Sequence, residues 1–249
     1  MRVPNLLILD FDGVICDSID ECFAASWSAY LGLYRSERPA AEPTEAARRE
    51  FARLRPFIRT GEDFVLIQEL LAAGGSVRDQ AGFDDASRRA GAEKRALYRE
   101  LFYRARTELL ERDRETWLAL NRIYPHMAIA LARLPAEAPL WILSTKEPRF
   151  IVEILSAHRL EVPEKRIVLS EGEPKLAAAE RLRIQGSFDA AMLVEDQIDH
   201  LRGNANDRVQ PFLAAWGYVQ PEWLREPAGI PLLTPEGFLE LVDREYGRR

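Results

Sequence analysis

The sequence predicts an α/β fold: a parallel sheet with helices on both faces and an all-helical segment inserted after the first strand. An apolar run at residues 5–10 is typical of a buried strand. Residues from about 17 to 122 place apolar side chains at helical spacing and show almost no strand pattern. Beyond residue 124 strands and helices alternate, as they do in parallel sheets.

The first strand, "NLLILD" (5–10), is followed by a turn at Gly13. The inserted segment contains helical stretches at residues 21–33, 45–54, 62–75 and 92–110. Further strands are expected at 140–144, 166–170, 189–195 and 211–218, with helices at 148–158, 174–184 and 234–247. In the last helix, Thr234 is the expected N-cap and Pro235 the first helical residue. These patterns predict two domains, an α/β core of residues 1–16 and 123–249 and a helical domain of residues 17–122.

Composition narrows the class of protein. Of the 249 residues, 47% are hydrophobic, which suffices for a sizeable core. The net charge of -6 disfavours a general nucleic-acid binder, and no apolar stretch is long enough to span a membrane. With only Cys16 and Cys22 and no signal-peptide pattern, we expect a reduced, cytoplasmic protein. The sequence does not indicate an oligomeric state.

Polar residues follow each predicted strand, where open parallel sheets form their sites. Strand one ends in Asp10-Phe11-Asp12, and strand two ends in Ser144-Thr145-Lys146. Lys175 opens the helix after strand three, and strand four ends in Glu195-Asp196 with Asp199 one turn on. In an extended chain Asp10 and Asp12 point to the same side, so their charges repel and favour a nearby cation.

This group of side chains suits phosphoryl transfer. Clustered carboxylates without nearby His or Cys are typical ligands of Mg²⁺. An aspartate beside such an ion can attack phosphorus, while a metal, a lysine and a hydroxyl neutralise the phosphoryl oxygens. The histidines His126, His158 and His200 show no metal-ligand spacing and are expected at or near the surface, with His200 closest to the fourth strand end.

The chain resembles the haloacid dehalogenase-like hydrolase superfamily, in its phosphatase branch with a helical cap after the first strand. The resemblance rests on the motifs "DFDGVICDS", "WILSTKEP", "EPKLAAAERL" and "MLVEDQID". It implies a Rossmann-like core of three-layer α/β/α type, a helical cap, Mg²⁺ as cofactor and an aspartyl-phosphate intermediate.

The resemblance also implies roles for individual residues. Asp10 would be the nucleophile and a Mg²⁺ ligand, and Asp12 the general acid/base, with its backbone carbonyl on Mg²⁺. Ser144 would hold the phosphoryl group and Lys175 would link nucleophile and phosphate. The acidic group of the fourth motif would bind the metal, but its spacing leaves open which of Glu195, Asp196 and Asp199 are the ligands.

Three further residues are expected to contact the substrate. Thr145 lies beside Ser144, and Arg55 and Arg59 flank Pro56 in a helix-breaking stretch of the helical segment. Because cap loops close over the substrate in this family, the two arginines would meet an anionic leaving group, although solvated helix faces are the simpler explanation for most arginines of this segment. Lys146 is expected at the surface, at the start of a helix, and Lys165 precedes strand three.

These features predict a Mg²⁺-dependent phosphatase acting on a small phosphorylated metabolite. A phosphomutase of the β-phosphoglucomutase type remains an alternative because "VED" resembles its acidic pair. A non-catalytic binding or regulatory protein with the same fold is the second alternative. Asp12 disfavours a dehalogenase, and the late position of Lys94, the only lysine of the helical segment, disfavours a phosphonate-cleaving enzyme.

Overall fold

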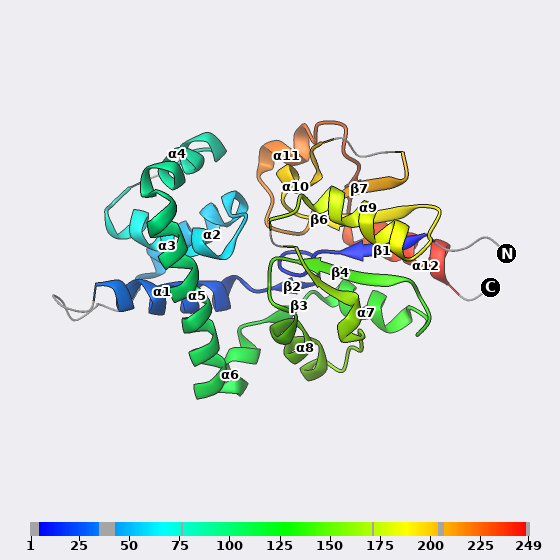
Figure 1. The fold of residues 1–249 in the computed structure, drawn as a ribbon, viewed down its shortest axis with the longest axis horizontal. Helices are drawn as coiled ribbons and strands as arrows, with labels where there is room; N and C mark the ends of the chain where they lie inside the picture. The colour runs from blue at the N-terminus through cyan, green and yellow to red at the C-terminus, as the bar shows by residue number, and fades with distance from the viewer. Residues whose placement is uncertain (1–4, 35–42, 76, 171, 204–206, 248–249) are drawn as a thin grey trace. The chain divides into compact units, whose positions relative to one another are not determined.

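The computed structural model describes residues 5–34, 43–75, 77–170, 172–203 and 207–247 (Figure 1). The chain forms two compact units, one of Met1–Asp17 with Arg122–Arg249 and one of Ser18–Asn121. The first unit reaches Asp17 and resumes at Arg122 because these residues pair, in a short antiparallel ribbon of β2 (Cys16–Asp17) and β3 (Arg122–Ile123). Sequence patterning did not predict this ribbon, since two-residue strands leave no periodic signal.

A six-stranded parallel sheet forms the centre of the first unit, which confirms the predicted fold class. Its order is β5-β4-β1-β6-β7-β8. The strands are β1 (Leu6–Leu9), β4 (Leu140–Ser144), β5 (Ile167–Leu169), β6 (Ala191–Glu195), β7 (Val209–Ala214) and β8 (Leu232–Leu233). Leu7 pairs with Leu140 on one side and with Met192 on the other. β1 therefore lies inside the sheet, which explains its unbroken apolar sequence.

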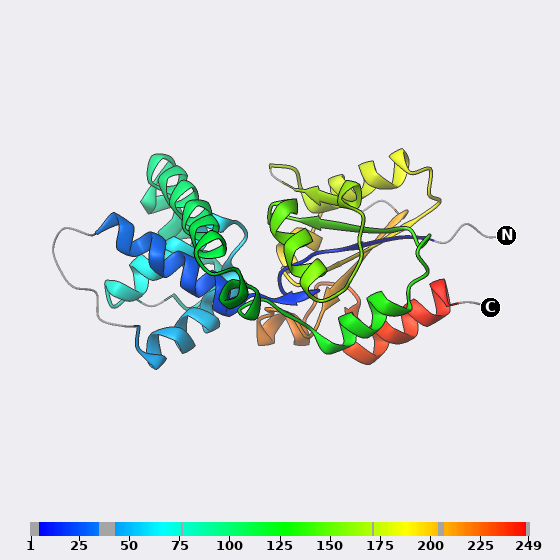
Figure 2. The same cartoon turned by 90° about the horizontal axis from the view of Figure 1, so that it is seen from below.

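Helices cover both faces of this sheet. They are α7 (Pro125–Arg133), α8 (Pro148–Ala157), α9 (Lys175–Gln185), α10 (Ile198–Leu201), α11 (Pro221–Arg225) and α12 (Pro235–Tyr246), with a 3-10 turn η2 at Glu164–Arg166. α9 and α10 pack on the face that carries Leu6, Ile8 and Leu193. Figure 2 shows α9 on one side of the sheet and α7 with α12 on the other. At the last helix, Thr234 Oγ1 accepts the N–H of Gly237 and Pro235 is the first residue, as predicted.

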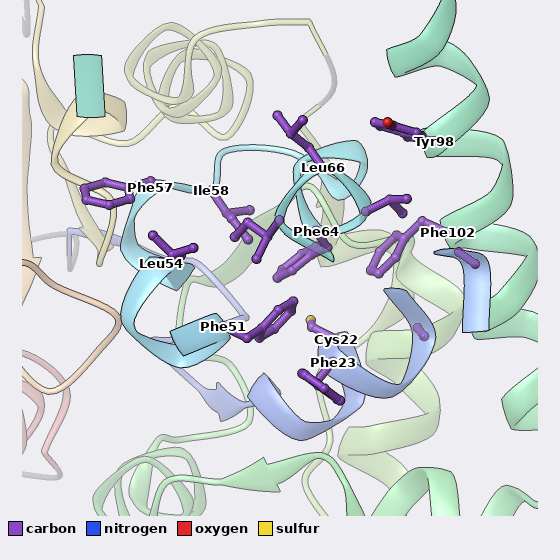
Figure 3. Packing of buried hydrophobic residues seen from close by; sticks show 14 of the residues in the cluster. Cys22, Phe23, Phe51, Leu54, Phe57, Ile58, Phe64, Leu66, Tyr98 and Phe102 are labelled. Carbon is purple, nitrogen blue, oxygen red and sulfur yellow. The ribbon is translucent and has the colours of Figure 1, made fainter. Parts of the chain in front are cut away.

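The second unit is helical. It contains α1 (Ile19–Leu33), α2 (Glu45–Leu54), η1 (Arg55–Phe57), α3 (Gly61–Ala72), α4 (Gln80–Ala90), α5 (Ala92–Arg112) and α6 (Arg114–Ala119). Its core is built on aromatic rings, with Phe64 stacked on Phe51 and on Phe102 at centroid distances of 6.0 and 5.1 Å (Figure 3). Such ring pairs stabilise a core beyond their buried area. The role of this unit as a cap stays a prediction.

A buried ion pair joins two helices of this unit. Arg106 of α5 donates from Nε and Nη2 to the two carboxylate oxygens of Glu21 in α1, at 2.8 and 2.9 Å. The two side chains are only 3% and 0% exposed. The indole Nε1 of Trp117 also donates to Glu21, at 3.4 Å. The bidentate geometry compensates for the loss of hydration of both charges.

Within the described part of the chain, none of the helices combines the length and apolar character that crossing a bilayer requires.

Candidate active site

The site begins where β1 ends. Asp10 follows Leu9, and its backbone N–H still donates to the carbonyl of Val194 in the neighbouring strand, at 2.9 Å. The side chain of Asp10 is therefore held at the carboxyl edge of the sheet, where β1, β4 and β6 end side by side. Asp10 is only 6% exposed. A carboxylate so buried requires a compensating cation.

Lys175 supplies that charge. It is the first residue of α9, and its Nζ lies 2.8 Å from Oδ1 of Asp10. The same ammonium group is paired with Oε2 of Glu195, at the end of β6. All three residues are buried. The structure thus brings together three of the residues predicted from three different strand ends.

The pKa values of these groups reflect their burial and mutual attraction. Burial raises the pKa of Asp10 to about 6, with a further contribution from the negative charge of Glu195 and opposition from Lys175. Burial also disfavours the charged form of Glu195, but Lys175 and His200 outweigh it and hold the pKa of Glu195 well below its usual range. Burial lowers the pKa of Lys175, yet Asp10 and Glu195 together raise it. Lys175 is therefore charged at neutral pH.

Both oxygens of Glu195 have partners within the protein. Oε1 accepts the backbone N–H groups of Asp196 and Gln197 at 3.1 and 3.0 Å. Oε2 pairs with Lys175 and lies 3.4 Å from Nδ1 of His200. Glu195 thus fixes both the ammonium group of Lys175 and the turn that follows β6. His200 is partly buried, as the sequence suggested, and sequence spacing gave no sign of its contact with Glu195.

Asp196 is held by a loop from beyond β7. Its Oδ2 accepts the backbone N–H of Tyr218 at 2.7 Å. This approach requires glycine at position 217, because a Cβ there would clash with Cβ of Asp196 and lie 2.5 Å from the carbonyl oxygen of Gly13. Gly13 itself has φ +88°, and a Cβ on it would also collide with the Asp196 carboxylate. Two glycines therefore allow three loops to meet at the site.

Three carboxylates of this site could hold a metal ion. Asp10, Glu195 and Asp196 each offer an oxygen, and these atoms lie within 4.8 Å of one another in buried surroundings. Lys175 is paired with two of these carboxylates, Asp10 and Glu195, so a divalent cation would neutralise the remaining negative charge of the three. An all-oxygen set suits a hard cation such as Mg²⁺. The predicted contact of the Asp12 backbone carbonyl with the metal stays a prediction.

Asp199 lies outside this group. Its Oδ1 accepts a hydrogen bond from Nη1 of Arg202 at 2.9 Å, and its side chain is 24% exposed. The backbone N–H of Asp199 donates to Oε1 of Gln197 at 3.1 Å. Although sequence spacing kept Asp199 among the candidate ligands, the structure groups only Glu195 and Asp196 of the fourth motif with Asp10, among the described residues.

Ser144 ends β4 and is buried. Its Oγ accepts the backbone N–H of Lys146 at 3.2 Å, so the hydroxyl hydrogen remains available to another acceptor. Thr145 is half-buried in the same turn. The predicted roles of Ser144 and Thr145 in substrate binding stay predictions.

Lys146 does not lie at the surface, so that expectation was wrong. It is 2% exposed, and its Nζ lies 2.8 Å from Oδ1 of Asp12. The ammonium group also lies 5.4 Å from the ring centroid of Phe11. Its position directly after a strand end was a usable signal, because the other site residues follow strand ends too. The site therefore contains two lysine–aspartate pairs.

A model of the haloacid dehalogenase-like hydrolase family matches residues 4–206, which is most of the chain. The chain belongs to this family. It is thus a haloacid dehalogenase-like hydrolase by sequence as well as by fold, which confirms the resemblance drawn from its four motifs. The comparison with curated proteins gave no significant match.

Solved structures with the same fold cover almost the whole chain. A hydrolase from Pseudomonas syringae is 17% identical, with 96% of this chain and 98% of that chain covered and a TM-score of 0.59. A protein named a predicted phosphoglycolate phosphatase, from Haemophilus somnus, is 16% identical, with 95% and 97% covered and a TM-score of 0.58. A haloacid dehalogenase family hydrolase from Deinococcus radiodurans, solved with bound phosphate and sodium, is 16% identical, with 97% and 96% covered and a TM-score of 0.54. At these identities the likeness shows the fold.

The two arginines predicted to bind substrate lie in the helical unit of this hydrolase. Arg55 is buried, with its guanidinium 5.2 Å from the ring centroid of Phe64. Arg59 pairs with Asp84, whose Oδ1 lies 2.6 Å from Nη1. The charge of Arg59 is therefore already compensated within its own unit. Contact of Arg55 and Arg59 with a substrate stays a prediction.

Proposed function

We propose that this haloacid dehalogenase-like hydrolase is a phosphatase that cleaves the phosphate ester of a small metabolite. The observation that carries the proposal is the buried Asp10–Lys175 pair at the edge of the sheet, with Asp12 two residues further along the chain and Ser144 at the end of β4. The names of structural neighbours, one of them a predicted phosphoglycolate phosphatase, support the same reaction class.

In the first step a carboxylate oxygen of Asp10 attacks phosphorus and the bond from phosphorus to the ester oxygen breaks. The leaving oxygen takes a proton from the carboxyl group of Asp12, and Asp10 becomes an aspartyl phosphate. Lys175 would stabilise the charge of the transferring group from its position 2.8 Å from Asp10. Ser144 would donate its hydroxyl hydrogen to a phosphoryl oxygen.

In the second step a water molecule attacks the phosphorus of the aspartyl phosphate. Asp12, now ionised, accepts a proton from this water, and the bond between Asp10 and phosphorus breaks. Inorganic phosphate leaves, Asp10 returns as a carboxylate and Asp12 is protonated again. The reaction consumes one water molecule and yields an alcohol and phosphate.

Asp10, Asp196 and Glu195 would hold the Mg²⁺ ion, together with the backbone carbonyl of Asp12. When bound, this ion would neutralise the negative charge of the phosphoryl group beside the carboxylates. Both oxygens of Glu195 already have partners within the protein. In this proposal Asp10 and Asp196 are therefore the main side-chain ligands of the Mg²⁺ ion.

The test is phosphate release from a panel of phosphorylated metabolites, phosphoglycolate included, with Mg²⁺ and with EDTA. Wild-type protein should release phosphate only with Mg²⁺. Asp10→Asn should abolish release, whereas Lys165→Met, at an exposed position outside the site, should not change it. Release that persists in Asp10→Asn would refute the proposed nucleophile.

A phosphomutase is the second candidate, favoured by the adjacent buried acids Glu195 and Asp196. Such an enzyme would keep its phosphoryl group until a sugar phosphate accepts it. Incubation with a sugar bisphosphate, followed by analysis of the sugar phosphates formed, distinguishes the two activities. Isomer formation faster than phosphate release would support the mutase.

A further inference from the structure

Lys146 connects the loop that carries Asp12 with Ser144 at the end of β4. Its Nζ lies 2.8 Å from Oδ1 of Asp12, and its backbone N–H donates to Oγ of Ser144 at 3.2 Å. The neighbouring ring of Phe11 lies 5.4 Å from the ammonium group and contributes a cation–π contact. One residue therefore holds both the predicted acid and the predicted phosphoryl-binding hydroxyl.

The burial of Lys146 is costly for the fold. Its side chain is 1% exposed, whereas that of Asp12 is 15% exposed. An ammonium group loses most of its hydration at such a depth, and the attraction within a single ion pair rarely exceeds the free energy lost in this way. Among the described lysines, Lys165 shows the alternative, an exposed side chain. A buried charge at the carboxyl edge of the sheet is better explained by the reaction than by stability.

The two buried lysines of the site, Lys175 and Lys146, lie beside different acids. Lys175 is paired with Asp10 and Glu195, where the phosphoryl group would be bound. Lys146 is paired with Asp12, which in the proposed reaction faces the leaving oxygen. The ammonium group of Lys146 is thus separated from that oxygen by one carboxyl group. In the proposed reaction, Lys175 would place positive charge beside the phosphoryl group and Lys146 would place it beside the acid of the leaving group.

We infer that Lys146 is a positioning residue that holds Asp12 and stabilises the negative charge developing on the leaving group. This inference rests on the proposed phosphatase function. As the bond from phosphorus to the ester oxygen breaks, electrons move to the leaving oxygen, and a fixed cation near it lowers the energy of the transition state more than that of bound substrate. Poor leaving groups develop the most negative charge in the transition state, so their reactions are accelerated the most by this cation.

The experiment measures kcat/KM with Mg²⁺ for a series of aryl phosphates whose phenols span a range of pKa. In wild-type protein the rates should depend weakly on phenol pKa. Lys146→Met should reduce turnover of the poorest leaving groups by about 100-fold, the scale of losing one electrostatic donor, and that of the best ones far less. The plot of log kcat/KM against phenol pKa should therefore become steeper. Lys146→Arg, which keeps the charge, should recover part of the wild-type slope.

Two controls separate this inference from loss of structure and from failure of the proposed function. Lys165→Met should keep the wild-type slope, and the melting temperature identifies any variant that fails to fold. A uniform loss in Lys146→Met at unchanged slope, with Asp10-dependent turnover in the wild type, would overturn the inference alone. Absence of turnover in wild-type protein would overturn the phosphatase proposal and this inference with it.

If Lys146→Met fails to fold, Lys146→Gln and Lys146→Arg decide the question. Glutamine keeps a hydrogen-bond donor for Asp12 but removes the charge. A steeper slope in Lys146→Gln than in Lys146→Arg supports the inference. Equal slopes overturn it.

Discussion

Nζ of Lys175 lies 2.8 Å from Oδ1 of Asp10, and both residues are almost fully buried. The two come from the start of α9 and the end of β1, and they meet because α9 begins beside the carboxyl ends of the strands. Glu195 holds the same ammonium group from β6. The result is a fixed positive charge beside the predicted nucleophile.

Replacing Lys175 by Met should therefore lower kcat/KM for phosphate esters by roughly 100- to 1,000-fold. The physical reason is the loss of the cation that stabilises the transferring group. Without it, the carboxylates of Asp10 and Glu195 also face each other unscreened. Steady-state kinetics tests this, with Lys165→Met as the matched lysine control; a variant with wild-type kcat/KM would contradict the role given to Lys175.

The metal site predicts different outcomes for two acids that lie three residues apart. Asp196→Asn should raise the Mg²⁺ concentration for half-maximal activity by at least about tenfold, because one oxygen ligand is lost while the acceptor for the N–H of Tyr218 is kept. Asp199→Asn should leave that concentration unchanged, because Asp199 pairs with Arg202 instead. EDTA should abolish activity, and Mg²⁺ should restore it. Equal effects of the two substitutions would contradict this ligand assignment.

The Glu21–Arg106 pair makes a prediction about stability. Arg106→Met leaves the fully buried carboxylate of Glu21 without its bidentate partner and should cost roughly 3–5 kcal/mol in the free energy of unfolding. The exposed pair of Arg104 with Glu100, at 3.7 Å, is the control, and Arg104→Met should cost less than about 1 kcal/mol. Urea denaturation measures both. Replacing Glu21 and Arg106 together by apolar residues should cost less than Arg106→Met alone.

Asp63 makes the stability of the helical unit depend on pH. Burial raises its pKa from 3.8 to about 6, against the opposing hydrogen bonds from the backbone N–H groups of Arg59 and Thr60. Between these two pH values the folded state binds more protons at Asp63 than the unfolded state, so this contribution to stability falls as pH rises. It is fully present below pH 3.8 and lost above about pH 6.

The substitution Asp63→Asn should remove this dependence while keeping an oxygen that accepts both N–H groups. Wild-type stability relative to Asp63→Asn should thus decline by at most about 3 kcal/mol between pH 4 and pH 7. Urea midpoints at several pH values test the slope. If the free energy of unfolding of the wild type instead rises relative to that of Asp63→Asn as the pH increases, the prediction is contradicted.

The sequence by itself determined the fold class and the positions of most site residues. Unbroken apolar runs predict buried parallel strands, and the residues that follow them must lie at one edge of the sheet. Asp10, Lys175 and Glu195 could be placed together for this reason, although they are far apart in the chain. Most of the helical segment was equally readable from its periodicity. The exceptions are α4, which buries only Phe83 and Ala86, and the six-residue α6, which buries Trp117.

Only the tertiary structure decided which charged groups meet. Lys146 was expected at the surface, yet it is buried against Asp12, because a side chain's surroundings depend on which loops pack beside it. Lys165 is exposed. Asp196 and Asp199 lie about one helical turn apart, so their side chains meet different neighbours. Asp199 pairs with Arg202, whereas Asp196 contacts the loop at Gly217. The β2–β3 ribbon joins segments about a hundred residues apart, and no local pattern encodes such a pairing.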